Sequence, residues 1–401
     1  MIRRSHFAQT GERSRIRNIL CFDGAGIYGL TQALWMQWLI NNDARLMSWP
    51  VDEGDRSMTE LFAGCSAGAV NAMLLARYSR PRDHIDEVVQ FWYEPGTWTN
   101  KYFPDSVTSL TGLTAWYGTQ DYKETLYDYF GDMRMGDLAF PVLIAIYDLS
   151  DADDANPRTR QWQPRVLVNY PAQIDSLSCL DVSQLPVAEV AYCATAVPSL
   201  RAIERGWADG GFVTADPSVQ AILGACIHDS GHHVDDASQV MDISEILRAA
   251  IFGHEAPLVA NAGDHFQPRS TLQGLKVFSI GDGGPETWCG DPDFNMGLQW
   301  SLLPSNLRDL PQGVFPPSAY DWLSPPVELA VQISRGLLED GNFFRLDPQI
   351  VWIPVSMTVY ACRVPAWRQY LLQMIERGVQ SPASMQALQQ ALEFIACLDS
   401  R

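Results

Sequence analysis

The pentapeptide GCSAG at residues 64–68 follows an apolar, strand-like run and precedes a helix-like stretch. A serine at such a strand-to-helix turn exposes its hydroxyl, and the next backbone N–H, that of Ala67, can donate to an oxyanion. The lack of side chains at Gly64 and Gly68 avoids collisions with the neighbouring strand and helix. The pattern indicates Ser66 as a nucleophile, although a turn of small residues that packs a helix on a strand has the same five letters.

A second glycine-rich segment, DGAGIYG at residues 23–29, lies between a predicted strand and a predicted helix. Backbone N–H groups at the beginning of a helix bind anionic oxygen, so Gly24, Ala25 and Gly26 suit either an oxyanion or a pyrophosphate. Dinucleotide binding also requires a strand that ends in Asp or Glu about 20 residues later. Residues 42–50 lack a strand pattern, which makes cofactor binding the weaker alternative.

A third segment, Asp209-Gly210-Gly211, lies well downstream of Ser66. Asp followed by glycine is by itself typical of a turn. A carboxylate within hydrogen-bond reach of a serine can, however, take its proton and activate it as a nucleophile. Most serine hydrolases use a His for this step, which leaves a Ser–Asp–His triad as an alternative. Five histidines follow Asp209, at positions 228, 232, 233, 254 and 265.

The order of these three motifs resembles that of the patatin-like phospholipases, a family related to cytosolic phospholipase A2. Two further segments are similar to the family. FSIG at residues 278–281 looks like a strand that ends in S-I-G, and FRLDP at residues 344–348 resembles a late strand common in bacterial members. Together the similar segments cover about residues 17–350. We therefore expect a bacterial protein of this family.

The resemblance implies a role for each matching position. Ser66 is the implied nucleophile and Asp209 its direct partner in a catalytic dyad. Backbone N–H groups form the implied oxyanion hole, at Gly24, Ala25, Gly26 and Ala67. The supporting glycines of the motifs are Gly64, Gly68, Gly210 and Gly211. The implied reaction forms an acyl ester on Ser66 from a lipid and hydrolyses it with water, without a metal or another cofactor.

Two positions depart from the family pattern. Ala25 replaces a usual Gly, which preserves a backbone donor where the φ angle is permitted for alanine. Tyr28 replaces a usual Arg or Lys, and the missing cation bears on how the site would meet an anionic headgroup. Tyr28 and the net charge of −19 together favour an acyl hydrolase in general over a phospholipase in particular.

The resemblance implies a three-layer α/β/α fold with a mostly parallel central sheet and a helical C-terminal portion. The alternation of apolar strands with longer helical stretches agrees with this class. We expect a flexible tail at residues 1–16, a catalytic domain at residues 17–350 and a helical extension at residues 351–401 packed on that domain.

Residues 91–130 are rich in aromatic side chains, with 12 among 40 residues. Such a composition suits either a cap through which acyl chains enter the site or rings that pack on the sheet. The candidate cap residues are Trp92, Trp98, Phe103, Trp116 and Tyr117.

The composition excludes some functions. The net charge of −19 leaves no basic surplus to bind nucleic acid. It also weakens general attraction to anionic membranes, so contact with lipid must depend on local surface. The eight cysteines are scattered and no run of about 18 apolar residues occurs. We therefore expect a cytoplasmic protein that touches membranes transiently at their periphery.

The leading hypothesis is an enzyme of the phospholipase A or lysophospholipase type that releases fatty acids from membrane lipids. One alternative is an antiviral-defence effector with the same site, activated by a cyclic nucleotide or a protein partner. A Ser–Asp–His esterase is a further alternative, and a non-catalytic binding module is the least favoured. A homo-oligomer is compatible with each of them.

Overall fold

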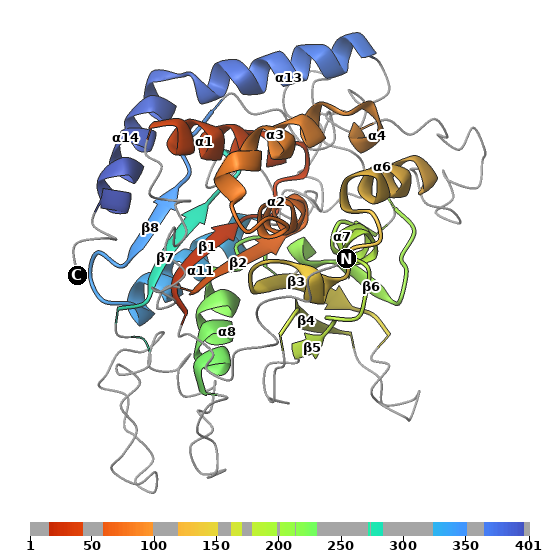
Figure 1. The fold of residues 1–401 in the computed structure, drawn as a ribbon. Coiled ribbons are helices and arrows are strands. Elements are labelled where there is room, and N and C mark those ends of the chain that lie inside the picture. The colour runs from red at the N-terminus through yellow and green to blue at the C-terminus, as the bar shows by residue number, and fades with distance from the viewer. Residues whose placement is uncertain are drawn as a thin grey trace, which may run out of the picture.

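The described strands of the computed structural model form one mixed, mostly parallel sheet (Figure 1). The structure describes residues 16–42, 59–98, 119–150, 162–170, 179–198, 201–212, 214–230, 272, 274–283, 324–350 and 365–396. The strands are β1 (Ile16–Phe22), β2 (Thr59–Cys65), β3 (Val142–Asp148), β4 (Gln163–Val168), β5 (Cys179–Asp181), β6 (Trp207–Asp209), β7 (Lys276–Ile280) and β8 (Phe343–Leu346). Their order is β5-β4-β3-β2-β1-β7-β8, and β6 pairs with β3 off this path. Among the described pairs, β3 meets β4 and β6 antiparallel, and the others are parallel.

Alternate side chains of β1 face two separate apolar layers. Leu20 and Phe22 belong to the larger buried cluster, whereas Ile19 and Cys21 belong to the smaller one. Successive side chains of a strand point to opposite faces of the sheet, so a strand that is apolar throughout requires cover on both faces. Helices supply this cover, and the predicted α/β/α class is confirmed.

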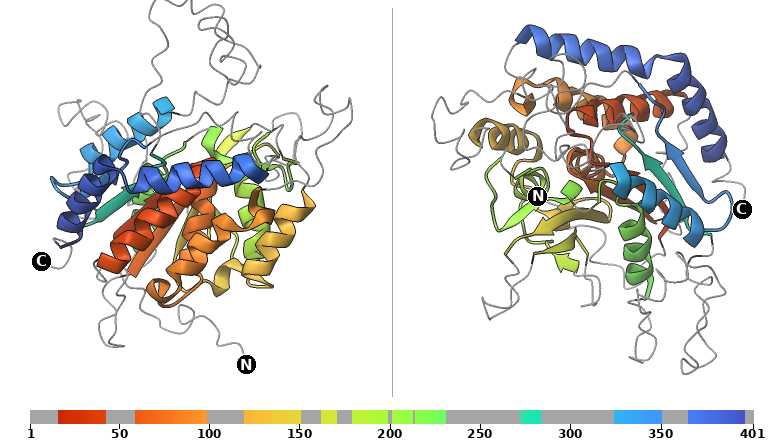
Figure 2. Two further views of the ribbon diagram at one scale, coloured as in Figure 1. Left: turned by 90° about the horizontal axis from the view of Figure 1, so that it is seen from above. Right: turned by 180° about the vertical axis from the view of Figure 1, so that it is seen from behind.

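Most helices cover the face with the larger cluster. They are α1 (Gly29–Asn42), α2 (Ala67–Ala76), α3 (Ile85–Tyr93), α6 (Gln120–Phe130), α7 (Val187–Ala194), α13 (Pro365–Val379) and α14 (Pro382–Ala396). The opposite face is covered by α8 (Ser218–Ser230), beside which α11 (Ser324–Leu337) packs (Figure 2). The short helices are α4 (Pro95–Trp98), η2 (Gly26–Tyr28), η4 (Pro81–His84), η5 (Met135–Asp137) and η7 (Gly210–Phe212). Within the described residues, every helix is too short or too polar to cross a membrane.

The ends of the chain differ slightly from the expected boundaries. β1 begins at Ile16, which is buried, so the predicted tail at residues 1–16 overlaps the sheet by one residue. The rest of that tail lies outside the described residues. At the other end, α13 and α14 fall within the predicted extension and place Leu371 and Leu388 in the larger cluster. Residues 351–364 of the extension lie outside the described part.

Candidate active site

Ser66 lies at a sharp turn between β2 and α2. Its backbone has φ 51° and ψ −124°, a combination that costs energy for any residue with a side chain. The turn is tight because β2 and α2 are in direct contact through two glycines. A Cβ at Gly64 would lie 2.4 Å from the carbonyl oxygen of Gly68, and a Cβ at Gly68 would lie 2.3 Å from that of Phe22. Ser66 therefore combines a strained backbone with a position at a sharp strand-to-helix turn, which suits a nucleophile.

Asp209 lies opposite this turn because β2 and β6 both pair with β3. Cys65 at the end of β2 pairs with Ala145, and Asp209 at the end of β6 pairs with Ile146, the next residue of β3. The two strands approach from opposite directions, since β2 is parallel and β6 antiparallel to β3. A Cβ at Gly210 would lie 2.4 Å from the carbonyl oxygen of Ala145, so only glycine fits directly after the aspartate.

The side chains of Ser66 and Asp209 are directly hydrogen-bonded. Ser66 Oγ donates to Asp209 Oδ2 over 2.5 Å, and the Gly211 N–H donates to Oδ1 over 2.8 Å. Asp209 is only 2% exposed, and its backbone N–H donates to the carbonyl oxygen of Ala196. The carboxylate is thus held from both of its oxygens and from its own backbone.

Burial raises the pKa of Asp209 from 3.8 to about 6. The hydrogen bonds from Ser66 and Gly211 and the positive charge of Arg201 act in the opposite direction and limit the rise in pKa. Burial dominates because the ionised carboxylate loses its water. A carboxylate with this pKa is a stronger base than an exposed one and is still mostly ionised at pH 7.

The hydrogen bond between Ser66 and Asp209 argues against the alternative of a Ser–Asp–His triad. In a Ser–His–Asp arrangement the imidazole lies between the two other side chains. Here Ser66 and Asp209 touch each other, which leaves no space for a ring between them. His228 lies in α8, but its side chain is outside the described part, as are the later histidines. Asp209 is therefore not placed as the residue that orients a histidine for Ser66.

The glycine-rich segment after β1 lies against Ser66, but one of its predicted donors is already used. The Gly24 N–H donates to the carbonyl oxygen of Ala215 over 2.8 Å, so the prediction that it serves the oxyanion hole is wrong. Within the described residues, the N–H groups of Ala25 and Gly26 have no backbone acceptor. The Ala67 N–H, at the first position of α2, has no intrahelical acceptor either.

The two departures from the family pattern have different consequences. Ala25 has φ −126° and ψ −7°, which alanine adopts without the strain of a positive φ, so its backbone donor is preserved. Tyr28 is fully buried in the larger cluster. The Tyr28 side chain therefore does not reach the surface, where it could meet a lipid headgroup.

The predicted aromatic cap is only partly within the described residues. Trp92 is 3% exposed, and its Nε1 donates to Asn71 Oδ1 over 2.7 Å inside the larger cluster. The cap interpretation is therefore wrong for Trp92, which packs on α1 and α2. The side chain of Trp98 and all of Phe103, Trp116 and Tyr117 lie outside the described part.

Arg201 is a charged neighbour of the site that the sequence did not single out. Its guanidinium lies 3.6 Å from the centroid of the Tyr122 ring, and its NH1 atom donates to Thr195 Oγ1 over 3.5 Å. Thr195 precedes Ala196, the residue that accepts the Asp209 N–H. The stacking holds a cation close enough to lower the pKa of Asp209.

Comparison with known proteins agrees with these features. The model of the family described as patatin-like phospholipase matches residues 20–222, about half of the chain. The chain belongs to the patatin-like phospholipase family. Members of this family are hydrolases that act on carboxylic ester bonds of lipids, and this chain is an enzyme of that class.

Similarity beyond the family model is low. The crystal structure of VipD from Legionella pneumophila matches with 10% sequence identity over 91% of this chain and 67% of that chain. The TM-score is 0.30, too low to support an argument about this chain. No curated protein matches the chain.

The described residues hold no group of three or more His, Cys, Asp or Glu side chains arranged for a metal ion. Four of the eight cysteines lie in described positions with described side chains, and each of these is a free thiol.

Proposed function

We propose that the chain is a serine lipid acyl hydrolase that uses Ser66 and Asp209 as a catalytic dyad to release fatty acids from membrane lipids. The observation that carries the proposal is the hydrogen bond from Ser66 Oγ to a buried carboxylate of raised pKa. A serine needs such a base to become a nucleophile, and Asp209 meets the requirement of hydrogen-bond reach.

The first half of the reaction acylates Ser66. The hydroxyl proton passes to Asp209 Oδ2 while Oγ attacks the carbonyl carbon of the ester. The oxyanion that forms accepts hydrogen bonds from the N–H groups of Ala25, Gly26 and Ala67. When the bond to the alcohol breaks, the proton on Asp209 passes to the departing oxygen, and the lysolipid leaves.

The second half of the reaction hydrolyses the acyl ester. Water attacks the acyl carbon and gives a proton to Asp209, and the same three N–H groups hold the second oxyanion. The bond to Ser66 Oγ then breaks, Oγ takes the proton back, and the fatty acid leaves. Donors aimed at the developing charge are worth about 10²–10³ in rate each in known hydrolases, which is why two or three backbone N–H groups suffice.

We place the enzyme in the cytoplasm, in transient contact with a membrane surface. The strongly negative net charge disfavours attraction to anionic lipids in general. A short-chain or zwitterionic lipid is therefore a better first substrate than an anionic one.

The proposal is tested with a fluorogenic acyl ester and with phosphatidylcholine vesicles. Wild type, Ser66→Ala and Asp209→Asn are compared, and a fluorophosphonate probe reports on the nucleophile. Ser79→Ala is the matched control, since Ser79 is an exposed serine outside the site. We expect turnover and labelling to vanish in Ser66→Ala and to persist in Ser79→Ala. Equal turnover by wild type and Ser66→Ala would refute the proposal.

A further inference from the structure

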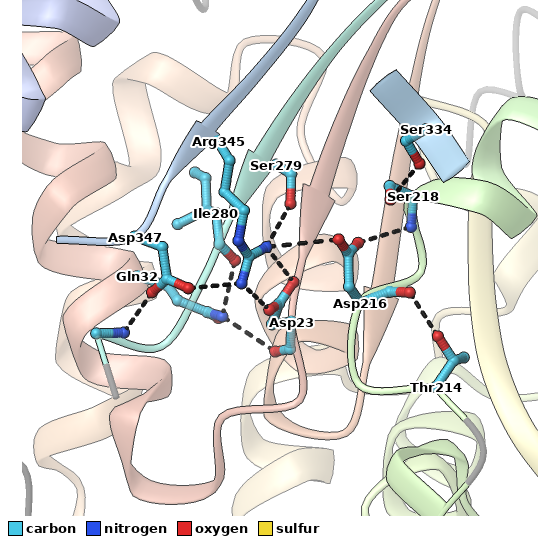
Figure 3. Close-up of polar contacts among 11 residues, drawn as sticks. Asp23, Gln32, Thr214, Asp216, Ser218, Ser279, Ile280, Ser334, Arg345 and Asp347 are labelled. Carbon is cyan, nitrogen blue, oxygen red and sulfur yellow. Dashed lines mark hydrogen bonds and ion pairs between the residues drawn. The ribbon is translucent and has the colours of Figure 1, made fainter. Parts of the chain in front are cut away.

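A buried guanidinium lies beneath the glycine-rich segment and connects it to the far edge of the sheet (Figure 3). Arg345 on β8 has a side chain that is only 9% exposed. It bonds to three carboxylates and one hydroxyl, which belong to Asp23, Asp216, Asp347 and Ser279. Figure 3 shows these groups converging on the guanidinium from the ends of β1, β7 and β8 and from the segment before α8.

The bond to Asp23 is the one closest to the proposed oxyanion donors. Arg345 NH2 donates to Oδ2 over 2.7 Å and NH1 to Oδ1 over 3.2 Å, so both carboxylate oxygens are held. The backbone of Asp23 is held as well. Its N–H donates to the carbonyl oxygen of Ile280, and its own carbonyl accepts from Gln32 Nε2 over 3.0 Å. Asp23 directly precedes Gly24, so its position sets where the next three residues begin.

The other contacts link the same guanidinium to the segment that follows the base. Arg345 NH1 lies 3.5 Å from Asp216 Oδ2, and Asp216 Oδ1 accepts the Ser218 N–H at the beginning of α8. The residue before Asp216 is Ala215, whose carbonyl accepts the Gly24 N–H. The segment after Asp209 and the segment after β1 are thus joined twice, once through Arg345 and once through their backbones.

Asp347 and Ser279 hold the guanidinium itself in place. Arg345 NH2 donates to Asp347 Oδ2 over 2.6 Å, and NH1 donates to Ser279 Oγ over 2.8 Å. Asp347 in turn accepts the Gly283 N–H over 2.8 Å. A planar guanidinium with several fixed partners has little freedom to shift, which makes Arg a better clamp than Lys at such a position.

The segment held in this way lies in contact with the proposed nucleophile. A Cβ at Gly24 would be 3.4 Å from Ser66 Cβ and 3.3 Å from Cys65 Sγ. A shift of Asp23 would therefore move Ala25 and Gly26 relative to Ser66. Misplacement by about 1 Å can cost about 100-fold in rate even when the chemical groups remain present.

We propose that Arg345 is a positioning residue for catalysis, which holds the Asp23–Gly26 segment and the Thr214–Asp216 segment in the relative arrangement that the oxyanion requires. The inference rests on the proposed function. It also extends the functional part of the chain, because Arg345 lies beyond residues 20–222, the part that the family model matches.

The test compares Arg345→Met with a variant that removes packing at a distance from Ser66. Leu388→Ala is the matched control, because Leu388 of α14 is fully buried in the larger cluster and has no part in the network. The enzyme and the fluorogenic ester are those of the previous experiment, and thermal unfolding is measured for every variant. We expect Arg345→Met to lower kcat about 100-fold while KM changes little, because the acyl site stays intact and the oxyanion loses its alignment. Leu388→Ala should lose thermal stability and keep its kcat below its unfolding temperature.

A second pair of variants covers the case in which Arg345→Met does not fold. Arg345→Lys keeps a charge but offers one point of contact instead of a fork, and we expect a drop in kcat of about tenfold. Asp23→Asn combined with Arg345→Lys should lower kcat no further than the worse single variant, because both act through the same bond. Additive losses, or an unchanged kcat in Arg345→Lys, would overturn the inference.

The two proposals fail in different ways. If wild type neither turns over the ester nor reacts with the fluorophosphonate, the proposed function is wrong. If wild type is active and folded Arg345→Met keeps its kcat, only the role of Arg345 is wrong. An equal loss of kcat in Arg345→Met and Leu388→Ala, at equal folded fraction, also overturns that role, because it would follow from general destabilisation.

Discussion

Replacing Asp209 by Asn tests two things: whether Asp209 acts as the base, and how much the burial of its ionised carboxylate lowers the stability of the folded protein. Burial raises the pKa of Asp209 from 3.8 to about 6. One pKa unit corresponds to about 1.4 kcal/mol, so the difference of about 2 units makes the ionised carboxylate about 3 kcal/mol less stable in the folded protein than in the unfolded chain. Asn has nearly the same shape. Its Oδ1 can accept the Gly211 N–H and its Nδ2 can donate to Ser66 Oγ, so both hydrogen bonds survive without the charge.

The sign of the effect on stability depends on pH. At low pH, below the unfolded pKa of Asp209, both states of the wild type carry the proton and the charge costs nothing. As the pH rises towards 6, only the folded state keeps the proton, and the stability that this proton provides is lost as the pH passes through the folded pKa. Asp209→Asn has no such proton. The free energy of unfolding of the variant should therefore rise by about 2 kcal/mol relative to wild type between pH 4 and pH 7, because at pH 4 the unfolded wild type has already lost much of its proton.

The measurement is urea unfolding of both proteins at several pH values, with ester hydrolysis measured on the same samples. Ser66→Ala is the control, because we expect it to be inactive while it keeps the buried carboxylate. Its stability should fall as the pH rises, as that of wild type does, with the folded pKa of Asp209 shifted upward by loss of the hydrogen bond from Ser66. The reasoning is refuted if the difference in unfolding free energy stays constant with pH. It is refuted equally if Asp209→Asn retains most of the hydrolytic rate.

Three further predictions concern the same site. The ratio kcat/KM should fall about tenfold per pH unit below pH 6, because only ionised Asp209 accepts the proton, and a flat profile down to pH 5 would contradict this. Arg201→Gln should move this fall to higher pH, because the charge of Arg201 lowers the pKa of Asp209, whereas Arg201→Lys should leave it in place; identical profiles for both variants would refute the coupling. Gly26→Ala should lower the free energy of unfolding, measured by thermal unfolding, by about 1–2 kcal/mol. The cost comes from its φ of +51°, because a Cβ there would meet nothing within 4 Å. Gly68→Ala should cost more, because its Cβ would lie 2.3 Å from backbone oxygen of Phe22, and the opposite ranking would count against the structure.

The sequence predicted the local geometry of the site better than its long-range contacts. A strand, a turn of small residues and a helix around Ser66 can be recognised from neighbouring residues, and the structure has them at β2 and α2. The pairing of Ser66 with Asp209 came from the order of motifs, because nothing in the local pattern of Asp209 distinguishes it from a turn. β6 has three residues, too few for any periodicity to predict a strand.

The occupied donor at Gly24 could not be predicted from the sequence. Its acceptor, the carbonyl oxygen of Ala215, belongs to a distant segment with no motif of its own. The burial of Tyr28 is of the same kind, because it depends on which helices cover the sheet. Arg345 did leave a signal, since a charged residue within the short apolar strand Phe343–Leu346 must find partners when it is buried. The identity of those partners depended on the strand order β1-β7-β8.

Because of that strand order, Ser66 and Asp209 are synthesised before the strands β7 and β8 that complete the sheet beside β1. The ribosome releases the chain from its N-terminus, so Ser66 and Asp209 emerge before Lys276–Ile280 exists to pair with β1. Until β8 follows, Asp23 also lacks the guanidinium that holds it. A nascent chain thus contains the proposed nucleophile and the proposed base in an incomplete sheet. We expect full hydrolytic activity only after β8 has joined the sheet beside β7.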